Sequence, residues 1–123
     1  MNNYDPFQHA DKLGVEVCWE ELPHNMHGLW TGTRVLLDPR LSTRQIRCDL
    51  SHELVHVELD EPYLHKSYAV RVENRCDKVA AARLIDYTEY HYLARAYRDN
   101  LPLLAVELGV TQEMLETFIK HHT

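Results

Sequence analysis

The sequence predicts an α+β domain, in which a small three-stranded sheet packs on a central helix and a helical part follows. Two observations carry this prediction. Short segments between residues 15 and 38 alternate apolar and polar residues or have an apolar centre, as strands do. From Leu41 onwards, apolar residues recur at the three- and four-residue spacings of helices. The 123 residues suit one domain, 1–123, with parts at 1–60, 61–99 and 100–123.

Composition excludes several classes of protein. The chain is 45% hydrophobic and 26% charged, which is ordinary for a globular domain, and its net charge of −6 disfavours nucleic acid as a partner. No apolar run approaches the roughly 20 residues of a membrane span, and the first residues do not resemble a signal peptide. The three cysteines, Cys18, Cys48 and Cys76, lack a C-x-x-C spacing. We therefore expect reduced thiols and a cytoplasmic protein.

The first third of the chain is expected to form one short helix and three strands. Asp5 and Pro6 are typical of a helix start, and Gly14 is typical of its end. The strands are expected at residues 15–19, 27–31 and 34–38. Such a sheet can cover one side of the helix that follows it.

The central helix, expected from Leu41 to Leu59, carries the pattern H-E-x-x-H. His52 and His56 are four residues apart and share one helix face, where both imidazoles can bind one zinc ion. Glu53 follows the first histidine, and in zincins a carboxylate at this position takes a proton from the zinc-activated water. The alternative is an amphipathic helix with two histidines on its buried side.

Two further features of this helix concern its start and its packing. Ser42 followed by Gln45 is a capping-box signature. Cys48 lies one turn before His52 on the same stripe, and we expect it to be a small buried thiol that packs in the core.

A catalytic zinc site needs a third protein ligand and an open fourth position. Glu73 is the best candidate, in a second helix expected from about Arg71 to about Tyr87. Asp77 lies one turn later on the same face, so one carboxylate can bind zinc and the other can support a ligand histidine. The alternative is that both carboxylates pair with neighbouring basic residues. His65, in a polar loop expected to include Tyr68, is a rival ligand.

An aromatic segment, residues 88–97, is expected to form a third helix. Packing is the expected role of its tyrosines. A role for Tyr90, His91 or Tyr92 in stabilising an oxyanion has no spacing rule behind it.

The last two helices, expected at residues 103–108 and 112–121, flank a tight turn at Gly109 and resemble a helix-turn-helix. The second of them carries Glu113 and Glu116 near its start, where a DNA-reading helix usually offers Arg, Asn or Gln. We therefore expect this unit to pack on the core, through Leu103, Leu108, Val110, Leu115 and Phe118, or to dock a protein.

Taken together, these motifs resemble the ImmA/IrrE family of zinc metallopeptidases, particularly its short actinobacterial and phage members. The resemblance covers roughly residues 13–121. It rests on the segment from Arg47 to His56, the Glu73-x-x-x-Asp77-x-x-Ala80-Ala81 pattern and the helix pair around Gly109. Val79 stands where many members have an aromatic residue, a difference that concerns packing.

This resemblance implies a zincin-like minimal metalloprotease core with Zn²⁺ as its cofactor. It implies that His52, His56 and Glu73 are the metal ligands, that Glu53 is the catalytic carboxylate and that Asp77 supports a ligand histidine. The gluzincins share this arrangement of Glu and Asp on the second helix.

The function implied is that of a zinc-dependent intracellular metalloendopeptidase. Its substrate would be a repressor or another regulatory protein of a phage, mobile element or stress response, with no specific nucleic acid and no membrane as partner. One alternative is a zinc-containing regulatory protein that docks a repressor without cutting it. Another is a structural zinc domain or a zinc-free interaction domain. The sequence makes no prediction about oligomeric state.

Overall fold

The computed structural model describes residues 3–23, 26–59 and 66–122, with the backbone alone described for residues 66–71. Its elements are α1 (Pro6–Lys12), β1 (Glu16–Trp19), β2 (Gly28–Trp30), β3 (Arg34–Leu37), α2 (Thr43–Leu59), α3 (Lys66–Leu84), α4 (Tyr87–Ala96), α5 (Leu101–Leu108) and α6 (Gln112–His122). The predicted α+β class is confirmed, and each strand is one or two residues shorter than predicted.

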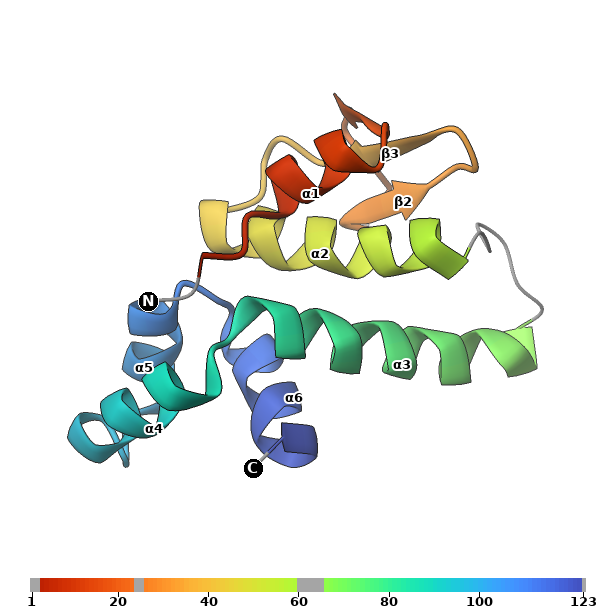
Figure 1. Ribbon diagram of the computed structural model, residues 1–123. Coiled ribbons are helices and arrows are strands. Elements are labelled where there is room, and N and C mark those ends of the chain that lie inside the picture. Colours follow the sequence, from red (N-terminus) through yellow and green to blue (C-terminus); the bar gives the residue numbers. More distant parts are fainter. Residues whose placement is uncertain (1–2, 24–25, 60–65, 123) are drawn as a thin grey trace.

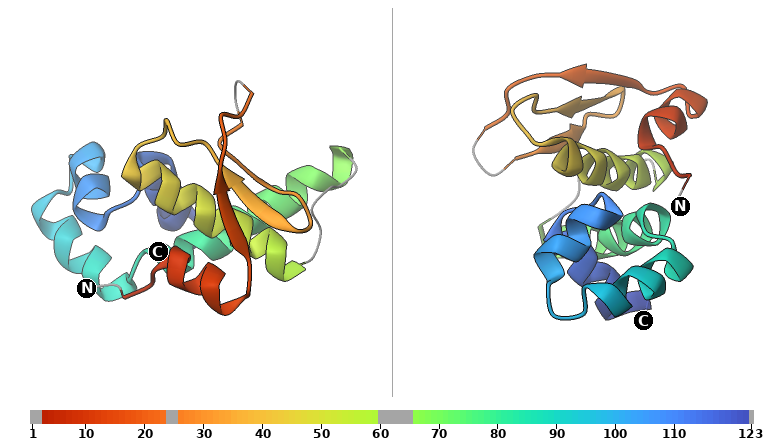
Figure 2. Two further views of the ribbon diagram at one scale, coloured as in Figure 1. Left: turned by 90° about the horizontal axis from the view of Figure 1, so that it is seen from above. Right: turned by 90° about the vertical axis from the view of Figure 1, so that its left-hand side faces the viewer.

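Helix α2 lies in the middle of the molecule, between the sheet and a layer of helices (Figure 1). The strand order is β1-β3-β2, with β1 parallel and β2 antiparallel to the central strand β3. Leu50 and Leu54 of α2 pack with Trp30, Val35 and Leu37 of the sheet to form a buried cluster. Burial of one α2 face against the sheet leaves another face for α3, as Figure 2 shows from two further sides.

The start of α2 agrees only in part with the predicted capping box. The backbone N–H of Gln45 donates to Ser42 Oγ at 3.2 Å, as the signature requires. The side-chain amide of Gln45 does not reach back, because it donates to both oxygens of Asp49 at 3.0 Å instead. Ser42 therefore caps the helix alone.

Helix α3 begins earlier than predicted. The sequence analysis placed Tyr68 in a polar loop, and that was wrong, because Lys66–Leu84 is one continuous helix. No glycine or proline interrupts this stretch, and each residue added to a helix gains a backbone hydrogen bond. Helices α2 and α3 run side by side in opposite directions (Figure 1). His65, the rival ligand, lies outside the described residues.

The C-terminal helices α4, α5 and α6 share a second core with the end of α3. Asn100 caps α5 by accepting a hydrogen bond from Leu103 N, and Gly109 ends it with φ of 71°, the left-handed conformation that glycine adopts readily. The buried members of this core are Cys48, Ala80, Ala81, Leu84, Ile85, Leu104, Ala105, Leu108, Val110, Met114, Leu115 and Phe118. Leu103 was predicted to be a contact, but it is 38% exposed, because α5 turns Leu104 and Leu108 inward.

The turn between α5 and α6 is fastened to α2 by two arginines. Arg44 Nη1 donates to the carbonyl oxygen of Val110 at 2.7 Å, and Arg47 Nη1 donates to that of Gly109 at 2.9 Å. Charged donors make stronger hydrogen bonds to carbonyl oxygens than neutral donors do. The helix pair therefore packs on the core, as the sequence analysis expected. In the described part of the chain, no helix has the length and apolar character to cross a membrane.

Candidate metal centre

The two histidines of the H-E-x-x-H pattern lie on one face of α2. Their ring centroids are 5.0 Å apart, and their side chains are only 12% exposed for His52 and 8% for His56. The four-residue spacing accounts for this proximity, since it places both side chains on adjacent turns of the same face.

Helix α3 brings Glu73 to both histidines. Glu73 Oε2 lies 2.7 Å from His52 Nε2, and Glu73 Oε1 lies 2.6 Å from His56 Nε2. The two Nε2 atoms thus converge on one carboxylate from a different helix. The structure places the three predicted ligands, His52, His56 and Glu73, together.

Asp77 holds the outer side of the His52 ring. Its Oδ1 lies 2.7 Å from His52 Nδ1. A carboxylate at Nδ1 fixes the orientation of an imidazole and leaves Nε2 to face the metal. The predicted geometry of Asp77 is therefore present, one helical turn after Glu73.

The charges of this group stabilise one another. Burial lowers the pKa of His52, but hydrogen bonds to Asp77 and Glu73 outweigh it and raise that pKa to about 10. Hydrogen bonds from His52 and His56 hold the pKa of Glu73 well below its usual range. In the protein alone, a proton shared with Glu73 thus holds the His52 imidazole to that carboxylate. A divalent cation can replace that proton with its own charge.

Glu53 faces the edge strand β2. Its Oε1 accepts a hydrogen bond from the backbone N–H of Trp30 at 3.0 Å. Gly28 allows this approach, because a Cβ at that position would lie 3.2 Å from both Glu53 Cγ and Leu37 Cδ2. Burial raises the pKa of Glu53, against the opposing effect of His52 and His56. The carboxylate is therefore suited to accepting a proton.

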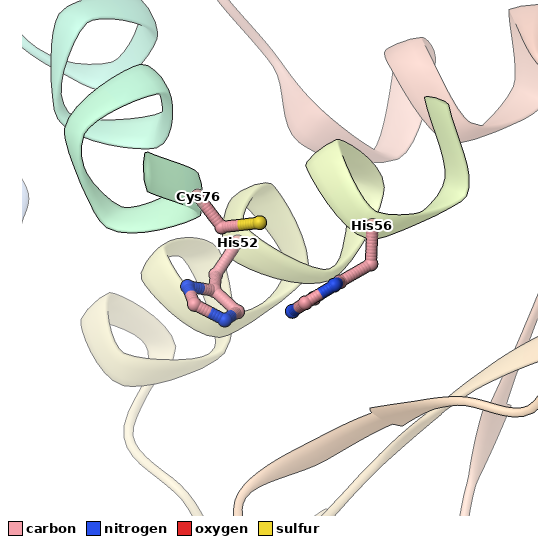
Figure 3. A group of neighbouring side chains, drawn as sticks. All are labelled: His52, His56 and Cys76. Carbon is pink, nitrogen blue, oxygen red and sulfur yellow. The ribbon is translucent and has the colours of Figure 1, made fainter. Parts of the chain in front are cut away.

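Cys76 is a residue at this centre that the sequence analysis did not connect with it. The Cys76 sulfur and one ring nitrogen from each of His52 and His56 all lie within 4.8 Å of one another (Figure 3). Burial and the nearby carboxylates raise the pKa of the Cys76 thiol to about 12. The available signal was its spacing from Glu73, since residues three apart on a helix share a face.

A cleft of about 270 Å³ opens beside His52. Its lining combines the site with α6 and the start of β2, namely Met26, His27, Gly28, Gln45, Cys48, Asp49, His52, Glu53, Glu73, Asp77, Thr111, Glu113, Met114 and Thr117. Cys48 reaches it from the core, where it is 2% exposed and accepts a hydrogen bond from the backbone N–H of Thr111, so its predicted packing role is confirmed. Tyr90, His91 and Tyr92 belong to α4, outside this lining, and Tyr90 packs on Phe118 instead.

The donor set fits zinc. Zinc in proteins takes imidazole nitrogen, thiolate sulfur and carboxylate oxygen, and these are the donors that face one another here.

A small sheet on an H-E-x-x-H helix, with a carboxylate from the next helix facing both histidines, defines a metallopeptidase-like domain. Residues 10–120 match the family Peptidase_M78, the IrrE N-terminal-like domain, and the chain belongs to this family. The resemblance to ImmA/IrrE proteins is thereby confirmed.

Solved structures include a protein of the same fold. The chain is similar to a Mycobacterium tuberculosis transcriptional regulator, with 19% sequence identity and a TM-score of 0.74. The similarity covers 94% of this chain and 39% of the regulator, so the chain spans well under half of that protein. A comparison with curated protein sequences gave no match.

Proposed function

We propose that the chain is a zinc-dependent metalloendopeptidase that acts inside the cell and cleaves a repressor or another regulatory protein. One observation carries this proposal. His52 Nε2 and His56 Nε2 converge on Glu73, and Glu53 lines the same cleft as His52 and Glu73. Membership of a family described as peptidases supports the reaction class.

In this proposal, His52, His56 and Glu73 hold the zinc ion, and Asp77 orients His52 through Nδ1. When bound, zinc supplies a water of lowered pKa and polarises the substrate carbonyl. The remaining chemistry falls to Glu53.

Glu53 moves the proton of the reaction. It takes a proton from the attacking water, whose oxygen bonds to the peptide carbon. It then delivers the proton to the peptide nitrogen as the C–N bond breaks. A raised pKa suits a carboxylate that must hold a proton between the two steps.

The walls of the cleft favour an extended, basic segment as substrate. Strand β2 is an edge strand beside Glu53, and an extended peptide can pair with such an edge. Asp49 and Glu113 add negative charge to the lining of the cleft. A cleft lined by one sign of charge attracts the opposite charge, here Lys or Arg.

A second candidate is a regulatory protein that docks a repressor without cutting it. Two observations favour it. Helix α6, from the helix-turn-helix-like pair, forms one wall of the cleft. The structural neighbour is named a transcriptional regulator.

The test is incubation of the purified chain with candidate repressors, with and without a chelator. We expect cleavage that the chelator stops. Glu53→Gln should keep zinc and lose cleavage. The matched control is Glu107→Gln, at an exposed residue of α5, which should cleave as the wild type does. Repressor binding without cleavage by the wild type would favour docking instead.

The ligand roles have a separate test. His52→Ala, His56→Ala and Glu73→Ala should each strongly reduce the zinc content of the purified protein, because a catalytic site has only three protein ligands. Near-stoichiometric zinc in the double variant Glu73→Ala/Cys76→Ala, which also removes the neighbouring thiol, would remove Glu73 from the ligand set.

A further inference from the structure

Cys76 lies on α3 between Glu73 and Asp77, the two carboxylates that contact His52. It follows Glu73 by three residues and precedes Asp77 by one, so the three side chains share the α3 face that meets α2. Figure 3 shows the Cys76 side chain reaching from α3 towards α2, with His52 and His56 on either side of its sulfur. Two of the three α3 side chains on this face already contact imidazole nitrogens.

Packing alone does not account for this placement. Cys76 is fully buried against Val55 and Val72, which is common for a small thiol. An alanine or valine would fill an apolar site equally well, yet this sulfur and two imidazole nitrogens all lie within 4.8 Å of one another.

We propose that the Cys76 sulfur is a fourth protein donor to the metal, which closes the position that a peptidase needs for water. The inference rests on the proposed function, since it takes zinc to be held by His52, His56 and Glu73. Zinc sites with four protein donors are structural, and those with three keep an open position. The chain would therefore hold its peptidase in a closed state until the sulfur leaves the metal.

The required movement is small. In a tetrahedral site with Zn–N distances of about 2.0–2.1 Å and a Zn–S distance of about 2.3 Å, donor atoms are roughly 3.3–3.6 Å apart. Here the three donor atoms lie within 4.8 Å of one another, so a closure of at most about 1.5 Å is enough. The thiol releases its proton to solvent as the sulfur binds. A thiolate also favours zinc over magnesium or manganese.

The test is X-ray absorption at the zinc edge on the full chain loaded with zinc. We expect one sulfur at about 2.3 Å from the metal. The double variant Cys18→Ala/Cys48→Ala retains only the Cys76 thiol and should keep this signal. Cys76→Ala should bind zinc through nitrogen and oxygen alone and should cleave substrate faster than the wild type. Cys18→Ala, on the distant strand β1, is the matched control and should cleave at the wild-type rate.

The outcomes separate this inference from the proposed function. Zinc bound by nitrogen and oxygen alone in the wild type would overturn the role of Cys76 and leave the peptidase proposal standing. A wild type that takes up no zinc would overturn both. If Cys76→Ala does not fold, the wild type and the double variant still decide, because both keep Cys76.

Discussion

Replacing Asp77 with alanine tests the geometry of the site most directly. Asp77 Oδ1 lies 2.7 Å from Nδ1 of His52, whose side chain is only 12% exposed. The substitution removes the acceptor that holds the ring, so the ring can turn Nε2 away from Glu73. Loss of such a partner typically weakens metal affinity by about 10–100-fold, which is about 1.4–2.7 kcal/mol.

The assay is competition for zinc between the protein and a chelator of known affinity at fixed pH. Asp77→Asn should recover part of the loss, because its amide oxygen can still accept from Nδ1. Asp99→Ala, on an exposed segment after α4, is the matched control and should bind zinc as the wild type does. Asp77 is itself 42% exposed, so a urea titration should show a folded variant. Equal zinc affinity in Asp77→Ala and the wild type would refute the reasoning.

Three further predictions concern stability and partners. Phe118→Ala should lower the free energy of unfolding, measured in urea, by about 3–5 kcal/mol, because Phe118 is 2% exposed in the C-terminal core. The fraction of this variant that is folded should bind as much zinc as the wild type. The pKa of Asp38 is held well below its usual range by the Arg40 side chain and backbone N–H, so its contribution to stability is present above about pH 4 and is lost as the pH falls. Asp38→Asn should thus be less stable than the wild type at pH 7, with a smaller loss on acidification; parallel curves would contradict this. In a gel shift, the chain should show no sequence-specific duplex binding, since its net charge is −6, and a salt-sensitive specific shift would contradict that.

Relations within one helix could be predicted from the sequence. The spacing of His52 and His56, and that of Glu73 and Asp77, fixes which side chains share a face, whatever the rest of the fold does. The histidine pair and the carboxylate pair can meet only if α2 and α3 pack side by side, which the spacing alone does not predict. The resemblance to a known family supplied this condition.

Contacts between different helices and strands were harder to predict from the sequence. Cys76 packs in the core with Val55 and Val72, but the spacing of residues along α3 does not say which side chains of α2 face it. The hydrogen bond from Trp30 to Glu53 uses a backbone N–H, which nearly every residue type has, so the sequence does not predict it. Leu103 was misplaced because α5 is apolar on more than one face, so the pattern did not select the buried one.

The hydrogen bond from Trp30 to Glu53 has a consequence for how a reaction could begin. A backbone amide has a single hydrogen, and here the edge strand gives that of Trp30 to Glu53. A peptide carbonyl that pairs with β2 through this amide must replace Glu53 Oε1 as the acceptor of the Trp30 N–H. The same event that seats the peptide then frees Glu53 Oε1. Until a peptide pairs with β2, the hydrogen bond from Trp30 holds the Glu53 carboxylate against this strand.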